Sequence, residues 1–82
     1  MLAESLYEQG LYDKAEDLFA TVQEFPQFQD QSLFRLADIQ IKKGQKEKAV
    51  KLFQQIVEKG KDPLWKDLAK KELQFAAISK KL

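Results

Sequence analysis

The sequence predicts an all-α fold of right-handed stacked helical hairpins, an α-solenoid that ends in one further C-terminal helix. Two observations lead to this prediction. One pattern of apolar residues with helical spacing occurs twice, 34 positions apart. The chain also has only three Gly and two Pro, which leaves little room for long loops. Because one helical hairpin cannot bury its apolar face alone, repeated hairpins are expected to stack against each other.

The repeat is detected by aligning residues 1–25 with residues 35–59. Eight positions are then identical, whereas ordinary composition would give roughly two. The matches fall at positions that helix packing uses, so the two segments are expected to fold alike. The identical pairs are Leu2/Leu36, Ala3/Ala37, Gly10/Gly44, Lys14/Lys48, Ala15/Ala49, Leu18/Leu52, Phe19/Phe53 and Glu24/Glu58.

The first unit is assigned to residues 1–27. It predicts a short helix over about residues 2–9, a turn at Gly10 and a second helix over about residues 12–24. Glycine suits this turn because it adopts the left-handed conformation that ends many helices. Phe25-Pro26 ends the second helix, since the residue before a proline disfavours helical geometry.

The second unit, residues 28–62, has the same plan. Apolar residues recur at helical spacing on both sides of Gly44, which ends the first helix of this unit. A second helix is predicted over about residues 46–59, closed by Gly60 and Asp62-Pro63.

Residues 63–82 are predicted to form a terminal helix with a proline in its first turn. A Leu-Ala pair at residues 68–69 marks it as the first helix of a third repeat. A terminal helix should have a polar outer face, yet this one carries two apolar stripes. We therefore expect an open end that another repeat or a second copy of the chain covers, within one domain spanning residues 1–82. The stripes are Leu64, Leu68, Phe75, Ile78 and Leu82, and Trp65, Ala69, Leu73 and Ala76.

The pattern L-A-x6-G-x4-A-x2-L-F and its period resemble those of tetratricopeptide repeats. In such a hairpin a small residue lets two helices cross closely, and an aromatic residue fills the space one turn further on. In the family's register the first helix would begin about five residues before Met1, so the first repeat is expected to be truncated. The matching residues are Gly10 and Gly44 at the turns, Ala15 and Ala49 at the crossings, Phe19 and Phe53, and Tyr12, whose counterpart Lys46 departs from the pattern.

The resemblance implies a non-catalytic scaffold that binds another protein. In arrays of this family the first helix of each unit lines a concave face, on which a peptide segment or a partner helix lies. The family's Lys and Asn set for gripping a terminal carboxylate is not matched, so such a carboxylate is not the expected ligand. Carried over by register, the candidate groove residues are Tyr7, Glu8, Gln31, Phe34, Arg35, Asp38, Ile41 and Lys42, accompanied by Glu4, Lys66, Lys70, Leu73 and Gln74.

Phe34 and Ile41 leave two interpretations open. They cannot share the inner stripe of their helix with Gln40 unless that stripe widens. Either both belong to the core and Gln40 faces water, or both are apolar anchors in the groove. Trp65 is interpreted as a core residue packed on the preceding helix, with a binding-surface anchor as the alternative.

The composition argues against catalysis. The chain has no Cys and no His, which removes the commonest general base and the commonest metal ligands. We therefore expect no enzyme activity, no cofactor and no metal site. The lack of Cys is compatible with both the cytoplasm and the bacterial periplasm. No apolar run approaches the roughly 20 residues that a membrane-spanning helix needs.

Charge is distributed unevenly along the chain. Residues 1–41 carry two basic and eight acidic groups, a balance of −6, and residues 42–82 carry twelve Lys and five acidic groups, a balance of +7. One interpretation is two differently solvated halves; the other is head-to-tail association or an acidic partner. A self-associating module, forming a dimer or array through open helical ends, is therefore the alternative function. Charge-driven nucleic-acid binding is a third class and is not expected, because the single Arg offers little for specific base contacts.

Overall fold

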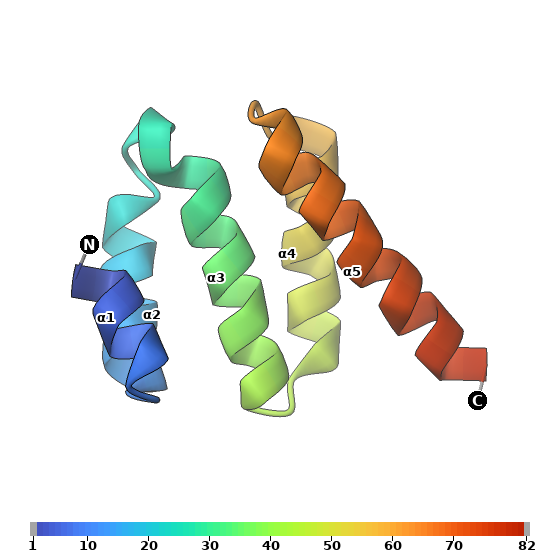
Figure 1. Cartoon of the computed structure of the whole chain (residues 1–82), viewed down its shortest axis with the longest axis horizontal. Coiled ribbons are helices and arrows are strands. Elements are labelled where there is room, and N and C mark those ends of the chain that lie inside the picture. Colours follow the sequence, from blue (N-terminus) through green and yellow to red (C-terminus); the bar gives the residue numbers. More distant parts are fainter. Residues whose placement is uncertain (1, 82) are drawn as a thin grey trace.

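The computed structural model describes the backbone of residues 2–81 and the side chains of residues 2–75. The described part consists of helices joined by short turns and has no strand. Figure 1 shows the helices side by side, with α1 and α2 at one end of the row and α5 at the other. The elements are α1 (Leu2–Glu8), α2 (Tyr12–Val22), the 3-10 turn η1 (Pro26–Phe28), α3 (Gln29–Lys42), α4 (Lys46–Lys59) and α5 (Pro63–Lys81).

The turn glycines behave as the repeat predicts. Gly10 and Gly44 have positive φ angles of 81° and 80°, and no other described residue has one. In each turn the following amide returns to a carbonyl five residues earlier, Leu11 N to Leu6 O and Gln45 N to Gln40 O. This bond satisfies a carbonyl that the helix end leaves unpaired. Both hairpins therefore close with the same turn.

The crossing residues also match the prediction. Ala15 and Ala49 are buried where the helices of each hairpin meet, and Phe19 and Phe53 are buried beside them. Two core clusters result, one among α1, α2 and α3 and one among α3, α4 and α5. Leu52 packs against both clusters, so the core continues through the row of helices.

The ends of the predicted helices are confirmed to within two residues, with α2 ending at Val22 instead of about residue 24. The 3-10 turn η1 was not predicted. It follows Phe25, whose extended backbone obeys the restriction that Pro26 imposes. The turn feeds directly into α3, so the link between the two hairpins is short.

Asp30 attaches the start of α3 to the loop between α4 and α5. Its carboxylate is buried and accepts hydrogen bonds from the backbone N–H groups of Lys61 and Asp62, at 2.8 and 2.7 Å. A buried carboxylate needs such donors because water no longer solvates it. The contact holds α5 in place at its N-terminal end.

The terminal helix α5 has one covered face and one open face. Ala69 is buried, and Trp65, Leu68 and Leu73 pack against the core. Leu64 and Phe75 are 59% and 74% exposed, so part of the predicted apolar surface is uncovered. The predicted stripe residues Ala76, Ile78 and Leu82 lie outside the residues whose side chains are described. Within residues 2–81, no helix has the length and apolar character required to cross a membrane.

Candidate partner-binding surface

The predicted concave face begins with α1 and α3, where polar side chains bind each other. The carboxylate of Glu4 accepts hydrogen bonds from the side-chain amide of Gln31 at 3.0 Å and from Nε of Arg35 at 2.9 Å. The Arg35 contact is also an ion pair between two partly buried side chains. Because the donors come from α3 and the acceptor from α1, this cluster fastens the two helices together.

Tyr7 makes a second link between the same helices. Its hydroxyl donates a hydrogen bond to Asp38, and the guanidinium of Arg35 lies 5.1 Å from the centre of its ring. Burial, followed by the hydrogen bond to Asp38, raises the pKa of Tyr7 to about 12. The ring also meets Tyr12 edge to face, with centroids 5.8 Å apart. Four of the predicted groove residues, Tyr7, Gln31, Arg35 and Asp38, therefore bind one another or Glu4.

Phe34 belongs to the core and is not a groove anchor. It is 8% exposed, and its ring centre lies 5.3 Å from the rings of both Phe53 and Trp65. The physical reason is that α3 is packed on two sides, by α1 and α2 and by α4 and α5, so it buries a wider face than a helix with one neighbour. Trp65 accordingly packs on the core, as the first interpretation had it.

Both interpretations gave Phe34 and Ile41 the same role, and the structure gives them different ones. Ile41 is 37% exposed, so it is not a core residue like Phe34. Gln40 does not face water: it is buried and donates its side-chain amide to Glu16 at 2.8 Å. A buried amide is tolerated when a partner satisfies it. The sequence pattern missed this partner because Glu16 comes from the preceding hairpin.

The ion pairs of Lys43 lie beside Gln40. Its ammonium is 2.6 Å from Asp13 and 3.1 Å from Glu16. Hydrogen bonds to these carboxylates, with Asp13 the larger cause, raise the pKa of Lys43 above its ordinary value. Glu8 and Lys42 are exposed, as are Lys70 and Gln74 of α5, whereas Lys66 is half-buried and Leu73 packs against the core. Glu8 and Lys42 therefore lie at the surface beside the polar contacts that join α1 to α3.

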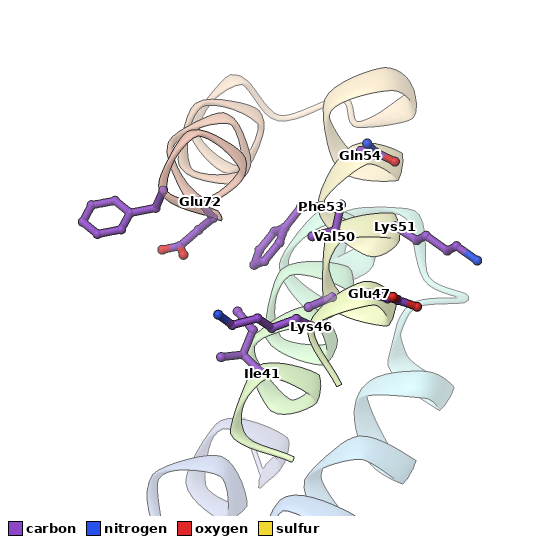
Figure 2. Close-up of a pocket in the computed structure, with 10 residues that line it drawn as sticks. Ile41, Lys46, Glu47, Val50, Lys51, Phe53, Gln54 and Glu72 are labelled. Atoms are coloured by element: carbon purple, nitrogen blue, oxygen red, sulfur yellow. The ribbon is translucent and has the colours of Figure 1, made fainter. Parts of the chain in front are cut away.

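An apolar groove opens next to Ile41, between α4 and α5. It has a volume of about 480 Å³, and Ala49, Val50 and Phe53 of α4 and Phe75 of α5 contribute its apolar lining. Figure 2 shows Phe53 and Glu72 pointing toward the same space, with Ile41 and Lys46 along one side of it. The charged and polar lining residues are Lys46, Glu47, Lys51, Gln54 and Glu72.

Sequence reasoning found one residue of this groove, Ile41, and missed the others. The groove exists because α5 packs against α4 near the connecting loop and diverges from it further along (Figure 1). Helical periodicity does not encode that angle. The signal that could have located the groove is Phe75 in the apolar stripe of α5, whose side chain no described helix covers.

The described side chains contain no group of three or more carboxylates that could hold a metal ion. A profile of the tetratricopeptide repeat family matches residues 6–72, which is most of the chain. No curated protein and no solved structure matches the sequence.

Proposed function

Because the chain belongs to the tetratricopeptide repeat family, we propose that it is a non-catalytic scaffold that binds a peptide segment or helix of another protein. Repeats of this family are generally protein-interaction modules. The observation that supports the proposal best is the apolar groove of about 480 Å³ between α4 and α5. A groove lined by apolar side chains and rimmed by polar ones is the usual form of a binding site.

In this proposal the partner segment enters the groove and extends along the concave face past Ile41. Val50 and Phe75 contribute apolar contact area from opposite sides of the groove. Lys42 and Glu8, both exposed, are then available to the polar part of the segment. Apolar burial supplies most of the affinity, and the charged rim selects the partner.

The polar residues of α1 and α3 have a positioning role. Glu4, Tyr7, Arg35 and Asp38 hold α1 against α3 and so shape the concave face. A partner would have to break these bonds in order to use the same groups, which would cost affinity. Their substitution should therefore change binding less than substitution in the groove does.

Selection of peptides from a random library against the immobilised chain tests the proposal. Selected peptides should lose at least about tenfold in affinity when Val50→Glu places a charge in the groove. Gln55→Glu, exposed on α4 and outside the groove lining, is the matched control and should leave the affinity unchanged. A selection that yields no binder, or binders indifferent to Val50→Glu, would contradict the proposal.

Association between copies of the chain is the second candidate function. It is supported by a different observation, the exposure of Leu64 and Phe75 on the end helix α5. Leu64 and Phe75 lie about 16 Å apart along this helix, so each offers a separate apolar contact to a second copy.

A further inference from the structure

The two ends of the molecule differ in charge. Residues 1–24, which contain α1 and α2 at one end of the row, carry six acidic groups and Lys14, a balance of −5, whereas the +7 balance of residues 42–82 is spread from the end of α3 to α5 (Figure 1). The molecule is 36 Å long in its longest dimension. This length exceeds the roughly 8–10 Å over which physiological salt screens charges, so an approaching molecule meets the negative charge of α1 and α2 largely separately from the charge of α5.

The acidic end has carboxylates that make no bond within the described residues. Asp13 and Glu16 are paired with Lys43. Asp17 and Glu24 are exposed and have no such partner. Between them lie two small exposed residues, Ala20 and Thr21, which leave the surface of α2 low enough for another helix to approach.

The opposite end combines positive charge with apolar surface. Lys70 and Lys71 are exposed on α5, between the exposed Leu64 and Phe75. Asp67 and Glu72 are on the same helix, so the local excess of positive charge is modest.

We propose that a second copy of the chain covers α5, docking head to tail through the acidic surface of its α1 and α2. The inference rests on the second candidate function and assigns its geometry. Charge decides between the two arrangements that would cover α5. Pairing of α5 with α5 of another copy brings like charges together, whereas head-to-tail docking brings Lys70 and Lys71 toward Asp17 and Glu24. A head-to-tail contact leaves one free end of each kind, so copies add in a row.

Sedimentation equilibrium of the full chain up to high micromolar concentration is the first arm of the test. The mean mass should rise with concentration, and the association should weaken by about tenfold at high salt. The acidic-end variant D17K/E24K and the basic-end variant K70E/K71E should each remain monomeric. K48E/K59E changes the charge as much as K70E/K71E does, but on α4, and should associate like the natural sequence. Circular dichroism checks that every variant keeps its helices.

Mixtures provide the second arm. In D17K/E24K the basic end is intact, and in K70E/K71E the acidic end is intact. An equimolar mixture should therefore associate, through the two intact ends and also through the two charge-reversed ends, although neither variant associates alone. A natural sequence that stays monomeric overturns self-association altogether. A natural sequence that stops at a dimer, or a K70E/K71E variant that still forms one, overturns the head-to-tail geometry while leaving self-association standing. The scaffold function is tested separately, by the selection of peptides that bind the groove, so it can fail or hold whatever the sedimentation results are.

Discussion

The face between α1 and α3 and the groove between α4 and α5 come from the same repeat plan. Hydrogen bonds between side chains close the face between α1 and α3, whereas the groove between α4 and α5 is open. Tyr7 in the first unit and Ile41 in the second hold equivalent positions, 34 residues apart. Tyr7 donates its hydroxyl to Asp38 and is held under Arg35. Ile41 has no polar group to place there and instead borders the groove. Positions that are identical in the two units therefore build the hairpin, while positions that differ between them determine what its surface can bind.

The groove between α4 and α5 depends most on Phe53, which belongs to the core and also lines the groove. Phe53→Ala should lower the free energy of unfolding by about 4 kcal/mol, because it leaves a cavity against Phe34. Chemical denaturation followed by circular dichroism measures the loss. Phe75→Ala is the control, since its ring is mostly exposed, and should cost little. A loss below about 1 kcal/mol for Phe53→Ala would show that the core does not depend on this ring.

The position of α5 depends on Asp30, so the groove should depend on it as well. Asp30→Ala leaves the amides of Lys61 and Asp62 without their acceptor, and we expect a loss of about 2–3 kcal/mol in the free energy of unfolding. The fluorescence of Trp65, the single tryptophan, should change because its helix begins at this loop. Asp67→Ala, on the exposed surface of α5, provides the comparison. Equal stability of the two variants would remove Asp30 from this role.

Substitutions in the polar face between α1 and α3 should change the stability less. Tyr7→Phe removes the hydroxyl that binds Asp38 and should cost about 1 kcal/mol of stability. It should leave peptide binding in the groove unchanged, because Tyr7 does not line the groove. Tyr12→Phe is the matched control, since no hydrogen bond of the Tyr12 hydroxyl to a described residue is found. A large effect of Tyr7→Phe on peptide affinity would place the partner on the α1–α3 face instead.

The smallest expected effect is a dependence of the Tyr7 contribution on alkaline pH. The folded-state pKa of Tyr7 is raised from 10.0 to about 12, so its hydrogen bond stabilises the fold fully below pH 10. This contribution is lost as the pH rises from 10 to about 12. The difference in unfolding free energy between the natural sequence and Tyr7→Phe should therefore shrink over this range. A difference that stays constant through it would contradict the assigned cause.

The sequence predicted the hairpins better than it predicted the site. Gly10 and Gly44 mark their turns because few other residues tolerate a positive φ, and this preference is local. Phe34 and Gln40 were harder to place, because their burial depends on neighbours from other hairpins, Trp65 and Glu16. The groove could not be predicted, since it follows from the angle of α5 against α4 and not from the apolar pattern of either helix.

The most direct test of the scaffold is to map a selected peptide onto the chain by amide chemical shifts in solution. If the groove between α4 and α5 is the binding site, the largest shifts occur around Ile41, Val50 and Phe53, and Val50→Glu abolishes them. The residues around Tyr7 and Arg35 then change little. Shifts concentrated around Tyr7 and Arg35, with Val50 unaffected, would contradict the assignment of the groove as the binding site.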